Sequence, residues 1–116
     1  MITLIDSSYL RFLNRIRVME ASIGVKKLDA LEKSLLDIVM MAFLNQAEIL
    51  VGDLLILREF GTQSTLHGRV TNLNKLGYIK LVLHAIDKRK KKVIPTKLAI
   101  NHYKNLSKIL AQSVYG

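Results

Sequence analysis

The feature that decides the fold is the stretch from Gly61 to Gly77, which reads GTQSTLHGRVTNLNKLG. Its apolar residues recur every three or four positions, which is the spacing of one buried helix face. The predicted buried stripe consists of Leu66, Val70, Leu73 and Leu76. Thr62 can cap the first turn with its hydroxyl, and Gly77 suits the left-handed position just past a helix end. The stretch therefore predicts a single helix over about residues 62–76.

The other face of this predicted helix is polar and contains no acidic residue. It carries Ser64, Thr65, Gly68, Thr71, Asn72 and Lys75, with His67 and Arg69 at its edges. Uncharged polar and basic side chains can form hydrogen bonds with the base edges and phosphates of DNA. We therefore expect this helix to enter a DNA major groove as a recognition helix.

A basic hairpin is predicted directly after the helix. Residues 78–85 are rich in β-branched and apolar side chains and predict a strand. Ile86 to Lys92, which reads IDKRKKK, predicts a turn with dense positive charge. Residues 93–95 predict a returning strand, and Pro95 is tolerated where a strand ends. A helix followed by a basic hairpin is typical of a winged helix, whose wing we expect on the DNA backbone or in the minor groove.

The excess of positive over negative charge lies entirely in the second half of the chain. Residues 61–116 contain eleven basic residues, and Asp87 is their one acid. Residues 1–60 contain seven basic and eight acidic residues, so they are nearly neutral. This asymmetry indicates a polyanionic partner for the half that holds the helix and the wing, with nucleic acid ahead of an anionic membrane.

Three helices are predicted before the recognition helix. The first runs from about Asp6 to Gly24, with an apolar stripe of Tyr9, Phe12, Leu13, Ile16 and Met19. The second begins at a capping box of Asp29 and Glu32 and runs to about residue 45. It is apolar nearly all round between residues 35 and 44, which predicts a central buried helix. A short third helix over residues 52–60 leads through a tight turn at residues 60–62 into the recognition helix, which completes a helix-turn-helix.

The remaining segments support the wing and the ends of the chain. Residues 46–50 form a link that can hold a short strand beside the wing. Thr96 is expected to cap a last helix of about twenty residues, with a stripe of Ala99, Tyr103, Leu106 and Leu110. The stripes of the first and last helices exceed what one small domain needs to bury. We therefore expect a homodimer formed through these two helices.

Together these elements predict an α+β, mainly α, fold: a winged helix-turn-helix with a basic β-hairpin wing and flanking N- and C-terminal helices. The 116 residues suffice for one compact domain. Within it, residues 1–27 form the N-terminal helix and link, residues 28–95 the winged helix-turn-helix core, and residues 96–116 the C-terminal helix.

Several functional classes find no support in the sequence. His67, His84 and His102 lack metal-ligand spacing, cysteine is absent, and no Gly-rich phosphate loop follows a strand. We therefore expect no catalytic residue, no metal and no cofactor. Met40 and Met41 are interpreted as core filler rather than as a ligand pocket, so a small-molecule effector is unsupported. The longest apolar run, residues 35–44, is too short for a bilayer, and no secretory signal is seen, so we expect a cytoplasmic protein that does not bind membranes.

Three stretches resemble the multiple-antibiotic-resistance regulator (MarR) family of bacterial winged helix-turn-helix proteins. They are residues 28–54, residues 64–79 with Ser64-Thr65-Leu66-His67, and Asp87-Lys88-Arg89 followed by Val93-Ile94-Pro95-Thr96. The resemblance implies a dimeric transcription regulator on a roughly palindromic operator. It also implies that Arg89 occupies the place of the family's wing arginine and that helices from both chain ends form the dimer.

The candidate DNA-binding residues lie on the predicted helix and wing. On the helix they are Gln63, Ser64, Thr65, His67, Gly68, Arg69, Asn72 and Lys75, and on the wing Lys88, Arg89, Lys90, Lys91 and Lys92. Asn72 can pair with adenine, Arg69 with guanine or phosphate, and the lysines with phosphates. Gly68, costly within a helix, indicates close approach of DNA or a tight contact inside the protein.

Other interpretations of these residues stay open. Ser64 and Thr65 can simply cap the helix, His67 can be a surface residue without a task, and the wing charges can be a solvated tip. The leading function is a sequence-specific double-stranded DNA-binding transcription regulator. The alternatives are a plasmid or phage replication or partition protein with the same module, and a winged helix that serves as a protein-interaction adaptor.

Overall fold

The computed structural model describes residues 7–22 and 27–115. Its elements are α1 (Ser8–Glu20), α2 (Ala30–Leu44), α3 (Val51–Leu55), α4 (Gln63–Lys75), β1 (Ile79–Leu83), β2 (Lys91–Pro95) and α5 (Lys97–Tyr115). They group into two compact units, one of residues 28–100 and one formed by the described parts of residues 1–27 and 101–116. The predicted fold class is confirmed, because a mainly helical chain carries one two-stranded antiparallel hairpin after the fourth helix.

Helix α2 begins at the predicted capping box. The Asp29 carboxylate accepts a hydrogen bond from the Glu32 amide at 2.7 Å, and Glu32 accepts one from the Asp29 amide at 2.9 Å. The helix buries Leu35, Leu36, Val39 and Met40. Met41 and Leu44 are exposed, so the prediction that this helix is buried all round was wrong for its last turn. Met40 is core filler as predicted, whereas Met41 is not.

Helix α3 is shorter than predicted. It ends at Leu55 rather than near residue 60, although Leu54 is fully buried as expected. Beyond Leu55 the backbone amides of Leu57, Arg58 and Phe60 bond to carbonyls two or three residues back. These short bonds unwind the helix into turns, so the connection to α4 is longer than a three-residue turn.

Helix α4 matches the prediction closely. The Thr62 hydroxyl accepts a hydrogen bond from the Thr65 amide at 3.2 Å, which caps the first turn. The side chains of Leu66, Val70 and Leu73 are buried, and Leu76 is half-buried. Gly77 adopts a φ of 86°, the left-handed conformation that ends the helix.

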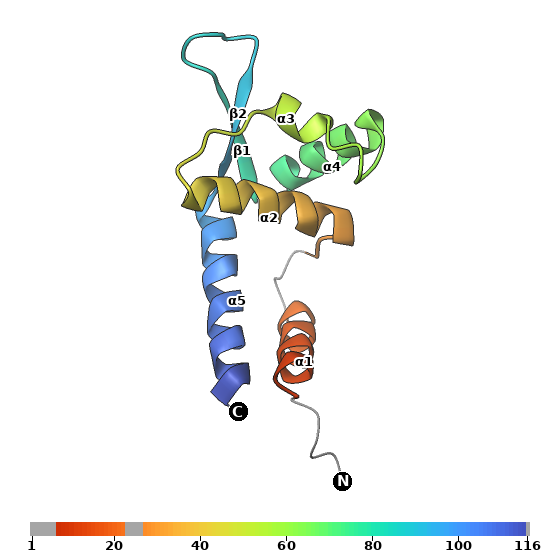
Figure 1. The fold of residues 1–116 in the computed structure, drawn as a ribbon, viewed down its shortest axis with the longest axis vertical. Helices are drawn as coiled ribbons and strands as arrows, with labels where there is room; N and C mark the ends of the chain where they lie inside the picture. The colour runs from red at the N-terminus through yellow and green to blue at the C-terminus, as the bar shows by residue number, and fades with distance from the viewer. Residues whose placement is uncertain (1–6, 23–26, 116) are drawn as a thin grey trace. The chain divides into compact units, whose positions relative to one another are not determined.

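The wing is an antiparallel hairpin of β1 and β2, paired from Ile79↔Pro95 to Leu83↔Lys91. Figure 1 shows it as a ribbon that projects beyond α3. The returning strand begins at Lys91 rather than at Val93, so Lys91 and Lys92 lie in β2 and not in the predicted turn. The predicted strand beside the wing is present as a single bridge between Leu50 and Lys92.

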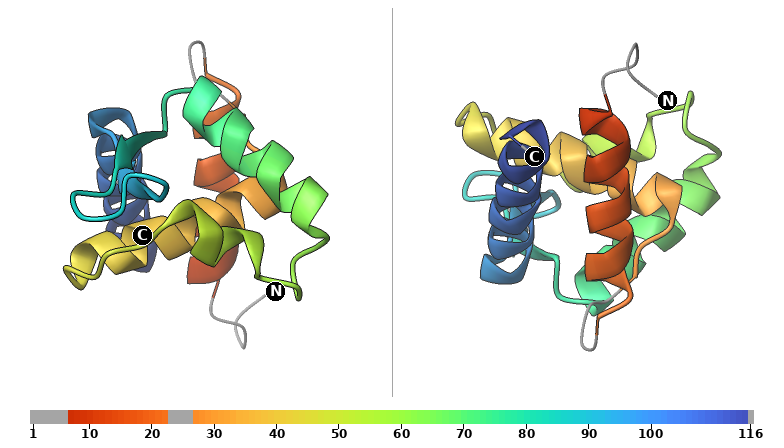
Figure 2. Two further views of the ribbon diagram at one scale, coloured as in Figure 1. Left: turned by 90° about the horizontal axis from the view of Figure 1, so that it is seen from above. Right: turned by 90° about the horizontal axis from the view of Figure 1, so that it is seen from below.

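The unit of residues 28–100 places α4 beside the N-terminal part of α2 and the wing beside its C-terminal end, as Figure 1 and the left view of Figure 2 show. The Thr96 hydroxyl joins these parts, because it donates to the carbonyl oxygens of Gly77 and Tyr78, between α4 and β1. The same hydroxyl accepts from the Ala99 amide at 3.4 Å and thereby caps α5, as predicted. The start of α5 is thus tied to the base of the wing.

The other unit consists of α1 and the C-terminal part of α5. Arg11 donates two hydrogen bonds, of 2.7 and 3.1 Å, to the Ser113 carbonyl oxygen, and Arg15 donates one of 3.3 Å to the Ser113 hydroxyl. No residue of α1 from Ser8 to Glu20 is buried. The exposed apolar side chains of this unit are Tyr9, Leu10, Leu13, Val18, Leu110, Val114 and Tyr115. The predicted start of α1 at Asp6 and its end near Gly24 lie outside the described residues.

In the part of the chain that the structure describes, every helix is too short or too polar to span a lipid bilayer.

Candidate nucleic-acid interface

Helix α4 presents a continuous polar face to solvent. The exposed residues of this face are Gln63, Ser64, Thr65, His67, Gly68, Thr71 and Lys75. Ser64, Gly68, Thr71 and Lys75 follow one another at steps of four, three and four, so they form one strip along the helix. Thr65 also belongs to the cap, because its hydroxyl accepts from that of Thr62 at 3.0 Å. The strip has the polarity that a DNA groove can accept.

Gly68 lies in the middle of this strip, and among residues 7–22 and 27–115 no neighbour gives it a steric reason. A Cβ atom added there would meet nothing within 4 Å. The alternative that Gly68 serves a tight internal contact is therefore wrong. A glycine in a helix interior costs about 1 kcal/mol against alanine, so its use here favours close approach of an outside partner.

Two candidate residues of α4 turn instead toward α2. The Nε atom of Arg69 lies 2.7 Å from Oδ2 of Asp29, as an ion pair without hydrogen-bond geometry at Nε. The amide of Asn72 donates to Oε2 of Glu32, a carboxylate that is only 4% exposed. Asp29 and Glu32 are the pair that forms the capping box of α2. In these positions both side chains join α4 to α2, so the predicted pairing of Asn72 with adenine, and of Arg69 with guanine or phosphate, would have to compete with these contacts.

We predict that Asn72→Ala destabilises the fold rather than altering sequence preference. The change removes one partner of the buried Glu32 carboxylate, which costs about 1–3 kcal/mol. Urea unfolding followed by circular dichroism measures the effect. Asn74→Ala is the matched control, because Asn74 is exposed on the same helix and its replacement changes helix propensity equally. Equal unfolding free energies for the two variants would contradict the role of Asn72.

The wing loop holds one arginine in a defined place. The Asp87 carboxylate accepts from the Arg89 amide at 3.1 Å and from its guanidinium at 3.0 and 3.2 Å. The Arg89 side-chain bond, followed by the bond from its amide, lowers the pKa of Asp87, and the same pair raises the pKa of Arg89. The Arg89 side chain is nevertheless 89% exposed. The guanidinium is therefore oriented by Asp87 and still accessible to a partner.

The lysines of the wing differ in accessibility. Lys88, Lys90 and Lys91 are exposed. Lys92 is 34% exposed, and its Nζ lies 4.0 Å from Oε1 of Glu48, in the link after α2. Of the four lysines, Lys92 is thus the one in an ion pair with Glu48, while the other three extend the positive surface of the wing.

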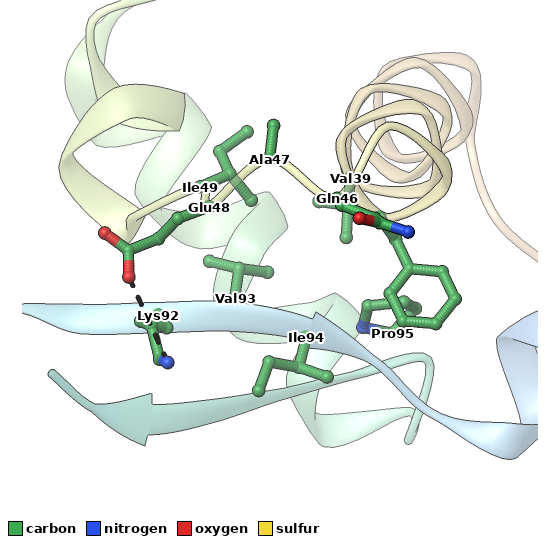
Figure 3. A pocket seen from close by; sticks show the side chains of 10 residues that line it. Val39, Gln46, Ala47, Glu48, Ile49, Lys92, Val93, Ile94 and Pro95 are labelled. Carbon is green, nitrogen blue, oxygen red and sulfur yellow. Dashed lines mark ion pairs between the residues drawn. The ribbon is translucent and has the colours of Figure 1, made fainter. Parts of the chain in front are cut away.

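A pocket of about 230 Å³ lies between the last turn of α2 and β2. Figure 3 shows Glu48 reaching toward Lys92 on one side of it, with Val39, Ile49 and Val93 among its lining residues. Neither Met40 nor Met41 lines this pocket, so the methionines do not mark a ligand site there. Sequence analysis gave Glu48 no role, and it considered His84 only as a metal ligand.

The structure connects Glu48 and His84. Nε2 of His84 lies 3.3 Å from Oε2 of Glu48, where β1 passes the link after α2. Within residues 7–22 and 27–115, no three His, Asp or Glu side chains gather as a metal site. No sequence signal joins two polar residues that lie in different segments of the chain, so this pair emerges only from the fold.

A scan against protein-family models gave no match, and neither did a search of curated proteins. Among solved structures, a MarR protein from Peptoclostridium difficile is similar over 98% of this chain and 74% of its own, with 20% identity and a TM-score of 0.55. BpsR from Bordetella bronchiseptica, whose structure describes regulation of DNA binding by 6-hydroxynicotinic acid, is similar over 100% of this chain and 83% of its own, with 19% identity and a TM-score of 0.51. The chain therefore has the MarR-like winged-helix fold that its sequence resembles.

Proposed function

We propose that this chain is a sequence-specific double-stranded DNA-binding transcription regulator. The observation that carries the proposal is the outward strip of α4 at Ser64, Gly68, Thr71 and Lys75, which is exposed, free of acids and open at a helical glycine. A basic wing follows this helix in the same unit. The regulators named among the structural neighbours support this class of function.

In the proposed complex α4 lies in the major groove. Ser64, Thr71 and His67 provide hydrogen-bonding groups for base edges, while Lys75 reaches a phosphate. The absence of a side chain at Gly68 lets the helix backbone approach the bases. Arg69 and Asn72 contribute by fixing the angle of α4 on α2 through Asp29 and Glu32.

The wing supplies most of the charge in this proposal. Lys88, Lys90 and Lys91 contact phosphates, and Arg89 enters the minor groove with Asp87 holding its guanidinium. A protein-interaction adaptor would have no use for this exposed cationic loop, so DNA is the favoured partner of the surface.

A binding comparison across polyanions tests the proposal. Fluorescence anisotropy at low salt should show tighter binding to a pool of random duplexes than to single-stranded DNA of equal length or to vesicles containing anionic lipid. A duplex preference is expected because a recognition helix needs the major groove of a double helix, which single strands and vesicles do not offer. Preference for vesicles or single strands would contradict the proposal.

We also propose that the protein binds as a homodimer. Tyr9, Leu10 and Val18 of α1 and Leu110 and Val114 of α5 are exposed apolar side chains of one unit, and a second copy of the chain could cover them. In the proposed dimer a two-fold axis relates two copies of α4, and each copy meets one half-site of a two-fold symmetric operator.

Sedimentation velocity measures this assembly directly. We expect the wild-type chain to sediment as a dimer at micromolar concentration, and a Leu110→Glu, Val114→Glu variant to sediment as a monomer because charges are costly in an apolar interface. Asn105→Glu, on an exposed position of the same helix, is the control that should leave the dimer intact. A wild-type monomer with and without DNA would refute the assembly.

A further inference from the structure

His84 occupies the base of the wing loop, directly after β1, with a side chain that is 19% exposed. Its Nδ1 atom accepts hydrogen bonds from the backbone amides of Ile86 at 3.2 Å and Asp87 at 3.1 Å. A ring nitrogen that accepts two N–H groups carries no proton itself. The proton of the neutral ring therefore lies on Nε2, which faces the Glu48 carboxylate.

These contacts form a continuous connection to the DNA-facing arginine. The Glu48 carboxylate pairs with Nε2 of His84, and Nδ1 of His84 accepts a hydrogen bond from the Asp87 amide. The Asp87 carboxylate in turn accepts a hydrogen bond from the Arg89 guanidinium. The link after α2 thereby determines where the tip of the wing points. An exposed loop that carries Lys88, Arg89 and Lys90 would otherwise have many conformations of similar energy.

We propose that His84 is the positioning residue of the wing, and that it sets Arg89 for DNA only while its ring is neutral. The inference rests on the proposed DNA-binding function. It adds a residue outside the DNA-contacting surface and a response to acid that neither the fold nor the neighbours assign.

Protonation acts on this site in a defined direction. A proton on Nδ1 places an N–H group against the two amide N–H groups of Ile86 and Asp87, so both loop hydrogen bonds are lost. Glu48 from the link pairs with the ring and also with Lys92 from β2. From the loop, the Asp87 amide bonds to the ring, and the Lys90 carbonyl oxygen bonds to the His84 amide. Neither Glu48 nor Lys92 can restore the two amide bonds to a ring that is protonated on Nδ1.

The direction in which DNA affinity changes with pH distinguishes two effects of protonating His84: the loss of the wing geometry and the gain of a positive charge. An extra positive charge near DNA strengthens binding, so electrostatics alone predicts tighter binding in acid. Loss of the wing geometry predicts weaker binding instead. Asp87 stays ionised across the range in which histidines titrate, because Arg89 holds the pKa of that carboxyl below its ordinary value. The Asp87–Arg89 pair therefore stays unchanged when DNA affinities at the two pH values are compared.

Two uncharged replacements of His84 separate two properties of its ring, the acceptance of hydrogen bonds from the loop amides and the change of charge with pH. In His84→Asn the side-chain oxygen can occupy the place of Nδ1 and accept the loop amides, but it cannot be protonated. In His84→Gln the longer amide reaches toward Glu48 and leaves the loop amides without their acceptor. Any difference between these variants reports on the loop bonds, since both remove the titrating group and both leave His67 in place.

The test is DNA affinity at about pH 8 and about pH 5.5, the ends of the range in which histidine changes charge. At the higher pH we expect His84→Asn to bind like wild type and His84→Gln to bind about tenfold more weakly, the effect of one or two lost hydrogen bonds. On acidification the wild type should lose about tenfold relative to His84→Asn. Equal affinities of the two variants, or tighter wild-type binding in acid relative to His84→Asn, would overturn the proposal.

A second measurement on the protein without DNA keeps the inference separate from the proposed function. Amide hydrogen exchange by NMR should give higher protection factors for Ile86 and Asp87 in wild type and His84→Asn than in His84→Gln at about pH 8. In wild type this protection should fall as the pH is lowered from about 8 to about 5.5, and in His84→Asn it should not. If the wild type binds no duplex at all, the proposed function fails. The protection of the Ile86 and Asp87 amides then still shows whether His84 orders the wing. Equal protection in all three proteins would show that it does not.

Discussion

Replacing Gly68 with leucine makes the protein more stable and its complex with DNA weaker. The free energy of unfolding rises by about 0.5–1 kcal/mol, because leucine favours a helix more than glycine does and the added atoms meet open space. Affinity for the preferred duplex falls by roughly 10- to 100-fold, comparable to the removal of a good bidentate pairing with a base, because the side chain holds α4 away from the groove. Opposite effects on stability and binding are rare unless a residue faces a partner.

A graded series makes this result specific. Gly68→Ala should gain similar stability and lose less affinity, because it adds one carbon atom where leucine adds four. Asn74→Leu is the control for an added apolar side chain on the exposed surface of α4, and it lies outside the strip of Ser64, Gly68, Thr71 and Lys75. Thermal unfolding and fluorescence anisotropy measure the two effects. Unchanged DNA affinity in Gly68→Leu would show that this strip does not face the groove.

Raising the salt concentration from about 50 to 200 mM should lower duplex affinity by about two to four orders of magnitude. The estimate assumes roughly four to eight phosphates neutralised per bound dimer, each of which releases counterions. Anisotropy titrations at several salt concentrations give the slope of log affinity against log salt. A slope near zero would show that the chain neutralises no phosphates.

The wing variants locate these phosphate contacts. Replacing Lys88, Lys90 and Lys91 together with alanine should make the slope shallower by about one for each phosphate that is no longer neutralised. The structure changes the set that sequence analysis favoured, because Lys92 lies in β2 and pairs with Glu48. Lys92→Ala therefore serves as the control and should change the slope less than any exposed lysine.

Sequence analysis succeeded where the physical cause of a structure is local. The cap at Thr62, the left-handed Gly77 and the capping box of Asp29 and Glu32 each depend on residues within four positions of one another. The buried stripe of α4 follows from the same short spacing. These elements were therefore predictable with their ends, and so was the basic hairpin after the helix.

The sequence pattern of α4 did not reveal contacts with residues that are distant in the chain. Arg69 and Asn72 have the chemistry of base readers, but their partners Asp29 and Glu32 lie forty residues earlier. Nothing in the pattern of α4 distinguishes a polar side chain that faces DNA from one that faces another helix. The exposed Met41 on α2 shows the same limit, because an apolar segment does not reveal which of its sides the fold covers.

The candidate site was predicted in part for the same reason. The residue types on α4 and the charge of the wing were visible, and the structure places most of them in solvent. The connection from Glu48 through His84 to Asp87 was not visible, because it joins a link, the end of a strand and a loop. Glu48 and Asp87, at the two ends of this connection, are acids beside a basic surface. From composition alone, acids are expected to weaken DNA binding.

The central claim is that α4 reads a DNA sequence, and selection from a pool of random duplexes tests it most directly. The purified wild-type chain is used at a salt concentration where it binds duplex DNA measurably, and the recovered pool is sequenced. We expect an enriched, roughly two-fold symmetric site with half-sites about one helical turn apart, and we expect its enrichment to be lost with Gly68→Leu. A recovered pool that stays as random as the starting pool, although the chain binds it, would contradict the claim.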